Sequence, residues 1–256
     1  MWKAVRIAVL LLVLLVVAGQ AWFDRFTTNR WQRTVHVGAL PVSADGSPVT
    51  AAYLARLDQK KIDEVSHYLN AEARRYGVGI EEPIALQLYP TLAEAPPALE
   101  PGAGVFTRIV WSLRLRYYRH RMLGGVRPRP QIALFLLYHD PALARTLPHS
   151  VGLQRGLSAV VHVFATPSQE AQNRIVITHE LLHTFGATDK YDRATGLPQY
   201  PQGLANPQLA PLYPQQQAEI MAGRLALSAT QARLPDSLDE ERVGPVTAKE
   251  VGWVGR

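Results

Sequence analysis

The sequence predicts an α+β fold in which a mixed, twisted sheet packs on helices and an irregular C-terminal subdomain follows. Two patterns predict this fold. Through residues 34–186, short apolar runs alternate with longer segments whose apolar residues recur at helical spacing. From Ala187 to Gly223 the chain is instead rich in proline, glutamine and glycine, which favours ordered loop. The hydrophobic share of 47% is enough for a core in a chain of 256 residues.

The first 23 residues have the pattern of an export or anchoring segment. Ile7 to Ala18 are consecutive apolar residues, and Lys3 and Arg6 precede them. This run is near the lower length limit for a membrane span once the aromatic pair that follows is included. Gly19 and Ala21 supply small residues that a signal peptidase accepts. We expect a single-pass anchor with the body on the non-cytoplasmic side, a cleaved signal and a secreted protein, or, third, a buried N-terminal helix.

Residues 24–48 are polar and are expected to form a stalk or linker, followed by one domain over residues 49–256. The linker contains one short alternating run, Thr34 to Val37. After it, Ala51 to Tyr76 carries apolar residues close to helical spacing and stops before Gly77. This pattern predicts a long surface helix.

Three apolar runs predict strands, and one further segment predicts a helix. The predicted strands are Ile84–Tyr89, Gln131–Tyr138 and Leu157–Ala165. Ala93–Gly104 is rich in proline and alanine and is expected to be a loop. Phe106–Met122 is expected to be an amphipathic helix, and the residues on its apolar face are Phe106, Ile109, Val110, Leu113 and Tyr117.

A third helix is predicted to begin near Thr166 and to end at Gly186. The Thr166 hydroxyl can cap it, with Pro167 at the first helical position and Gln169 completing a capping box. An apolar stripe would anchor this helix against the sheet, and its members are Ala171, Ile175, Leu182 and Phe185.

Charge and cysteine content limit the chemistry. The chain has no cysteine, so any metal must be held by histidine, aspartate or glutamate, and no thiol nucleophile exists. The net charge is +6, and one basic cluster consists of Arg114, Arg116, Arg119, Arg121, Arg127 and Arg129. A solvated helix face or contact with an anionic lipid or acidic partner accounts for this cluster. Because no nucleic-acid-binding module accompanies it, we expect no nucleic-acid partner.

The third helix contains the sequence HExxH, formed by His179, Glu180 and His183. Residues four apart lie on one helix face, so both imidazoles can reach the same ion. Glu180 is rotated by about 100° from His179, so it can approach a metal-bound water instead of competing as a ligand. This arrangement is typical of a hydrolytic zinc site. The alternative is a chance match in which the histidines lie on a helix surface or make core hydrogen bonds.

Asp189 is the candidate third metal ligand, which extends the motif to HExxHxxGxxD. Gly186 tolerates positive φ, so it can end the helix and turn the chain back toward the ion. In a competing geometry a later glutamate is the third ligand, and the candidates are Glu219, Glu240, Glu241 and Glu250. Asp189 would then be an exposed carboxylate paired with Lys190.

With these residues the chain resembles the metzincin clan of zincin metallopeptidases. The resemblance matches His179, His183 and Asp189 to the zinc ligands and Glu180 to the general base. It also matches Gly186 to the helix-ending glycine and Met221 to the methionine of the turn beneath the metal. The resemblance implies a zincin-like fold that contains an active-site helix.

It also implies a metalloendopeptidase that binds one zinc ion per chain and hydrolyses peptide or protein substrates, with Glu180 acting on a zinc-bound water. Substrate is expected to lie extended along an edge strand, for which Leu157–Ala165 is the candidate. Three loop tyrosines could contact the transition state, namely Tyr191, Tyr200 and Tyr213. Two alternatives stay open: a membrane-tethered, non-catalytic binding or assembly protein, and a zinc hydrolase of a non-peptide amide.

Overall fold

The computed structural model describes residues 30–100, 102–153 and 157–254, together with Trp2, Arg6 and Gly19. The predicted anchor or signal at residues 1–23 lies outside the described residues except at those three positions. Within the described part of the chain, no helix has the length and apolar character needed to cross a membrane.

Five strands form one mixed sheet in the order β2-β1-β3-β5-β4. Their bounds are β1 Val35–Ser43, β2 Ile84–Leu88, β3 Ile132–His139, β4 Val151–Leu153 and β5 Ser158–Phe164. Four of the strands are parallel, and β4 pairs antiparallel with β5. The three strands predicted from apolar runs are confirmed as β2, β3 and β5.

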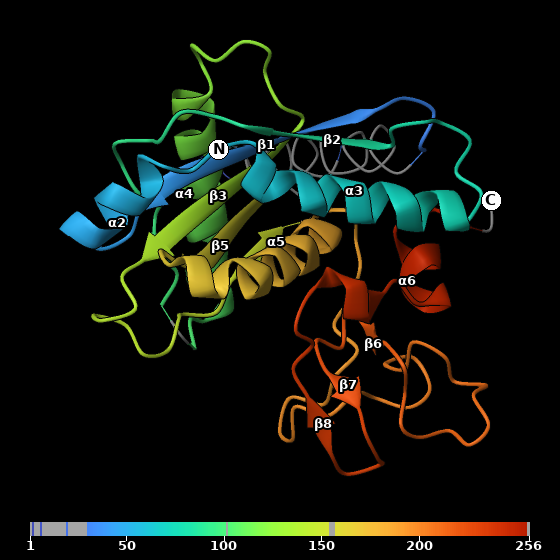
Figure 1. The fold of residues 1–256 in the computed structure, drawn as a ribbon. Coiled ribbons are helices and arrows are strands. Elements are labelled where there is room, and N and C mark those ends of the chain that lie inside the picture. Colours follow the sequence, from blue (N-terminus) through green and yellow to red (C-terminus); the bar gives the residue numbers. More distant parts are fainter. Residues whose placement is uncertain are drawn as a thin grey trace.

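Helices cover both faces of this sheet (Figure 1). Helices α3 (Lys60–Arg75) and α5 (Glu170–Thr184) lie on one face, and α4 (Val105–Met122) lies on the other. Alternate residues of each strand point to opposite faces of the sheet. Leu134 therefore packs in the core beneath α3 and α5, and Phe135 packs in the core beneath α4. A parallel sheet covered on both faces explains why the β3 sequence is an unbroken apolar run.

The predicted helix at residues 51–76 is wrong as a single element, because the chain forms two helices there. Helix α2 spans Pro48–Leu54, and α3 begins only at Lys60. The Asp58 carboxylate accepts a hydrogen bond from the backbone N–H of Lys61 at 3.2 Å, so the chain starts a new helix at this point.

The predicted linker at residues 24–48 is also wrong over its second half. Residues 35–43 form β1, which lies between β2 and β3 and is buried along most of its length. Immediately before it, the Trp31 indole donates a hydrogen bond to the carbonyl oxygen of Val251 at 2.8 Å. The folded body therefore begins by residue 31 and not at residue 49.

Helix α4 turns its predicted apolar face toward solvent. Phe106, Ile109 and Tyr117 on that face are exposed, whereas Trp111 and Leu115 are buried against the sheet. The helix is thus present at nearly its predicted position. However, it packs on the sheet with a different face from the predicted one.

Helix α5 begins without the predicted capping box. Thr166 has the extended backbone of an N-cap residue, but its hydroxyl lies 3.2 Å from the Ser168 hydroxyl and caps no backbone N–H. A 3₁₀ turn, η2 (Pro167–Gln169), leads into the helix instead. In the predicted apolar stripe, Ile175, Leu182 and Phe185 are buried, as expected.

The C-terminal region is mostly loop, as its composition predicts, and lies beside α5 on the side away from the sheet (Figure 1). Its short elements are β6 Ala218–Glu219, β7 Leu225–Ala226, β8 Ala232–Arg233, η3 Leu238–Glu240, β9 Glu241–Arg242 and α6 Pro245–Glu250. The predicted combination of a mixed sheet, packed helices and an irregular C-terminal subdomain is therefore confirmed.

Candidate metal centre

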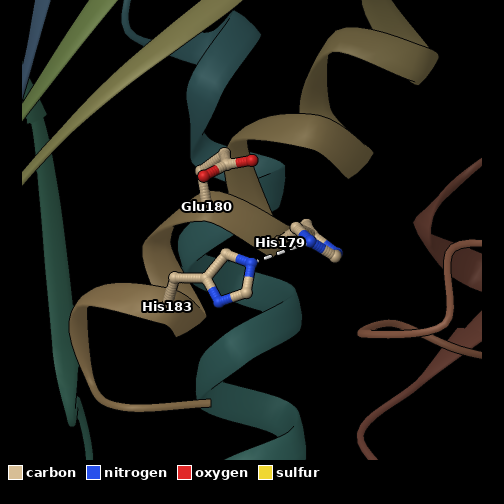
Figure 2. A group of neighbouring side chains, drawn as sticks. All are labelled: His179, Glu180 and His183. Atoms are coloured by element: carbon tan, nitrogen blue, oxygen red, sulfur yellow. Dashed lines mark hydrogen bonds between the residues drawn. The ribbon is translucent and has the colours of Figure 1, made fainter. Parts of the chain in front are cut away.

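The two motif histidines face each other from successive turns of α5 (Figure 2). The Nε2 atoms of His179 and His183 are 3.1 Å apart. Their side chains are 16% and 19% exposed, so the rings are largely shielded but reachable from solvent. The helical spacing therefore does bring both imidazoles to one point.

Backbone carbonyls fix which nitrogen of each ring carries a proton. The Nδ1 atom of His179 lies 3.0 Å from the Ile220 oxygen, and the Nδ1 atom of His183 lies 2.8 Å from the Ala187 oxygen. Because a carbonyl oxygen only accepts hydrogen bonds, each Nδ1 is the donor. Both Nε2 atoms then present lone pairs to the shared point, as metal-binding histidines do.

The chain reverses directly after α5, as the glycine predicts. Gly186 has φ +100°, and its N–H donates to the carbonyl oxygen of His183 at 3.0 Å. The N–H of Ala187 donates to the carbonyl oxygen of Leu182 at 3.1 Å. This pair of hydrogen bonds is a Schellman motif, which requires a left-handed residue at the position of the glycine.

The reversal brings Asp189 to the histidines. Its Oδ1 atom lies 3.3 Å from Nε2 of His179 and 3.1 Å from Nε2 of His183. The three atoms form a nearly equilateral triangle, whose edges are close to the roughly 3.3–3.4 Å expected between ligands of a tetrahedral zinc ion. Two imidazole nitrogens and one carboxylate oxygen are also a donor set that catalytic zinc sites use.

Three electron-rich atoms at these distances require a positive charge between them. The Asp189 Oδ1 atom is buried and, within the part of the chain that the structure describes, has no hydrogen-bond partner with suitable geometry. Hydrogen bonding to the two imidazoles, when they are protonated, holds the pKa of the Asp189 carboxyl well below its ordinary value. Either protons or a metal cation can supply this charge, and the lone pairs fixed on both Nε2 atoms favour the cation.

Glu180 lies beside His179 and His183 on the same helix (Figure 2). Its carboxylate is within 4.8 Å of the ligand nitrogens of both histidines. The residue is only 7% exposed, and its Oε2 atom has no hydrogen-bond partner among the described residues. Burial raises the pKa of Glu180, although the two imidazoles oppose this effect. A carboxylate placed in this way is suited to exchange protons with a water at the centre.

Strand β4 packs directly on the motif, which corrects the predicted edge strand. Residues 157–165 are not at the edge, because β4 pairs with β5 and occupies the edge itself. A Cβ atom at Gly152 would lie 2.6 Å from Cβ of His183 and 2.7 Å from the carbonyl oxygen of Glu180. The Gly152 backbone also acts to lower the pKa of Glu180, against the effect of burial. Only a glycine permits this approach.

Met221 lies in a buried turn that supports the centre. The N–H groups of Ala222 and Gly223 donate to the carbonyl oxygen of Glu219, and Met221 is fully buried. The carbonyl oxygen of Met221 accepts a hydrogen bond from the N–H of Lys190 at 2.9 Å. This turn therefore contacts the segment that carries Asp189, and it also provides the Ile220 oxygen used by His179.

The competing glutamate ligands are engaged elsewhere. Glu219 is fully buried and accepts hydrogen bonds from the N–H groups of Met221 and Gly244 and from the Thr247 hydroxyl. Glu250 pairs with Lys190 at 2.7 Å, so Lys190 does not take the role of partner to Asp189.

The remaining two candidates are also accounted for. Glu240 pairs with Arg233 at 2.7 Å. Both carboxylate oxygens of Glu241 are buried without a partner, and this residue is not part of the histidine cluster. Of the residues predicted as a possible third ligand, Asp189 is thus the one that lies beside the two histidines.

Among the three candidate tyrosines, Tyr191 is the one beside the centre. Burial raises the pKa of Tyr191, and the nearby carboxylates of Asp189 and Glu180 add to this effect. Tyr200 is 65% exposed. Sequence reasoning missed the contributions of Gly152 and of the two carbonyl oxygens, since backbone groups leave no signature in residue identity.

A scan against known protein families finds no match for this chain, and a search of curated proteins finds no relative. The assignment of a function therefore depends on the geometry of the centre and on the motif.

Proposed function

We propose that this protein is a zinc-dependent peptide hydrolase, a zincin metallopeptidase of metzincin type. The observation that carries the proposal is the convergence of His179 Nε2, His183 Nε2 and Asp189 Oδ1 within 3.1–3.3 Å of one another. The buried carboxylate of Glu180 beside them adds the group that hydrolysis needs.

The three ligand side chains would hold one zinc ion, which supplies a Lewis acid and acidifies a bound water. Glu180 accepts the proton of the attacking water and later delivers it to the leaving amine. The raised pKa of Glu180 favours the first transfer, because a carboxylate with a higher pKa is a stronger proton acceptor. Tyr191, which lies near Asp189 and Glu180, would donate a hydrogen bond to the substrate oxygen.

Strand β4 is the element along which we propose that an extended substrate lies. It is the edge strand next to α5, and its Gly152 touches the Glu180 side chain. Main-chain hydrogen bonds from such an edge can hold a peptide irrespective of its side chains. This arrangement favours a peptide over a compact amide as the substrate.

We also propose that residues 1–23 hold the protein at a membrane or export it, with the catalytic body on the non-cytoplasmic side. The apolar run from Ile7 to Ala18 and the preceding Lys3 and Arg6 support this orientation. Protease accessibility in cells with a permeabilised outer face tests it, and a protected body would contradict it.

The test of the function is metal analysis combined with digestion of a peptide library by wild type and Glu180→Gln. We expect about one zinc per chain in both proteins and loss of nearly all hydrolysis in the variant, because only the proton acceptor changes. Glu64→Gln is the matched control, since this glutamate lies on α3 and its side chain is 58% exposed.

Each outcome separates the alternatives. Zinc binding without hydrolysis in wild type would support a non-catalytic binding protein. Zinc-dependent hydrolysis of small amides but of no peptide would move the assignment to a non-peptide amidase. Equal activity in Glu180→Gln and wild type would remove Glu180 from the mechanism.

A further inference from the structure

Helix α4 is apolar on two opposite sides. The side that faces the sheet buries Trp111, Leu115 and Tyr118, each at most 6% exposed. On the outward side, the exposed apolar residues are Val105, Phe106, Ile109, Leu113 and Tyr117, at 48–78% exposure. A helix needs one apolar stripe to dock on its own sheet, so the second stripe is available for another partner.

The outward stripe is continuous along the helix. Val105, Ile109, Leu113 and Tyr117 are spaced four residues apart, so they lie on one face over about 18 Å. Phe106 widens the stripe at its N-terminal end. An apolar strip of this kind on one helix is typical of helices that lie in the plane of a membrane interface.

The sequence around the stripe is strongly basic, although Arg121 of α4 pairs with Glu94. Between Glu100 and Asp140 the chain contains no acidic residue and seven arginines. Two of these, Arg108 and Arg114, are exposed on α4 at the borders of the stripe. Positive side chains that flank an apolar strip are complementary to anionic lipid headgroups above an acyl layer.

The C-terminal end of α4 lies close to the start of β1. Arg119, in the last turns of the helix, donates a hydrogen bond to the carbonyl oxygen of Gln131 at 2.7 Å. The Gln131 side chain in turn accepts one from the N–H of His36 at 3.0 Å, two residues into β1. The C-terminal end of α4, which carries Arg119, His120 and Arg121, is therefore linked through Gln131 to the start of β1.

We propose that the outward face of α4 lies on a membrane surface that contains anionic lipids. A second copy of the chain fits this face less well, because a symmetric contact would bring the flanking arginines of both copies together. The contact would leave α5 and its motif on the opposite side of the sheet, facing away from the bilayer. The inference depends neither on zinc nor on hydrolysis.

The absence of cysteine allows a direct test on the full chain. Leu113→Cys gives a unique attachment site for an environment-sensitive fluorophore on the stripe. Ala71→Cys is the control, since Ala71 is exposed on α3, which covers the other face of the sheet. Each labelled protein is reconstituted in vesicles of phosphatidylcholine and in vesicles with equal parts of phosphatidylcholine and phosphatidylglycerol.

We expect a blue shift of the Leu113→Cys label in the anionic vesicles, a smaller shift in the neutral ones and none for the control label. High salt and the double variant Arg108→Glu/Arg114→Glu should remove most of the shift, because both weaken attraction to the headgroups. A label that stays water-exposed on anionic vesicles would overturn the proposal. So would a blue shift that follows protein concentration in detergent without lipid, since a second copy would then cover the stripe.

Discussion

The Nδ1 atom of His179 lies 3.0 Å from the carbonyl oxygen of Ile220, a residue 41 positions further along the chain. This hydrogen bond fixes the tautomer that turns Nε2 toward His183 and Asp189. Since the acceptor is a backbone oxygen, the orientation of the ring depends on the conformation of the turn at residues 219–223 and not on the Ile220 side chain. Helix α5 and the C-terminal subdomain are therefore joined at the candidate centre itself.

Asp189→Ala should weaken zinc binding by orders of magnitude, because the site falls to two protein ligands. Asp189→His should restore binding at least partly, since imidazole is a common zinc ligand. Titration of zinc into the metal-free variants measures both effects. Glu250→Ala is the matched control, because its side chain is about as exposed as that of Asp189 and it binds the neighbouring Lys190. Normal affinity in Asp189→Ala would end the metzincin assignment, and metal loss in Glu250→Ala would favour the rival ligand.

Gly152→Ala should reduce both stability and hydrolysis. The new Cβ would meet the α5 backbone at 2.7 Å, so β4 or α5 must move. Overpacking of this kind costs about 1–3 kcal/mol, and the displacement shifts Glu180 relative to the histidines. Urea unfolding and peptide hydrolysis measure the two effects. Gly79→Ala is the control, since a Cβ there has no atom within 4 Å, and equal losses in both variants would contradict the packing argument.

Glu219→Ala should destabilise the protein by roughly 3 kcal/mol or more, because three buried donors lose their acceptor. These donors are the N–H groups of Met221 and Gly244 and the Thr247 hydroxyl. Glu240→Ala, which removes a surface carboxylate that pairs with Arg233, should cost about 1 kcal/mol or less. Chemical denaturation compares the two variants. A Glu219→Ala protein of normal stability would show that this carboxylate does not hold the turn.

Glu241→Gln should stabilise the protein at neutral and alkaline pH and have little effect near pH 4.5. Burial, with a smaller contribution from Glu219 and Glu240, raises the pKa of Glu241 from 4.5 to about 9. The folded state of wild type therefore retains a proton that the unfolded state releases, so stability falls as pH rises through this window. The gain in the variant should reach about 3 kcal/mol near neutral pH.

Unfolding of both proteins at the two ends of this window, with a chelator present, checks the prediction. Glu240→Gln is the control of opposite sign, since its hydrogen bond with Arg233 lowers the pKa of Glu240 to about 2. This variant should lose stability at neutral pH. A Glu241→Gln protein that gains equally at both ends of the window would show that the buried charge is not responsible.

Local patterns were sufficient for the elements and for part of the centre. The apolar runs predicted β2, β3 and β5, and the HExxH spacing placed both imidazoles on one helix face because helix geometry repeats every 3.6 residues. Gly186 predicted the reversal that carries Asp189, since the requirement for positive φ is a property of one residue. These features depend on interactions within a few residues, which is why the sequence alone determined them.

Other features were decided only by tertiary contacts. β1 was predicted as part of a linker and β5 as an edge strand, because strand order depends on pairing between distant segments. Tertiary contacts also decided which face of α4 points outward. The helix has two apolar faces, so the spacing of its apolar residues cannot tell which one packs on the sheet. The Ile220 oxygen that orients His179, and the approach of Gly152 to Glu180, depend on where backbones meet in space. The identity of a residue does not indicate which distant backbone groups it will contact, so only the folded structure shows these contacts.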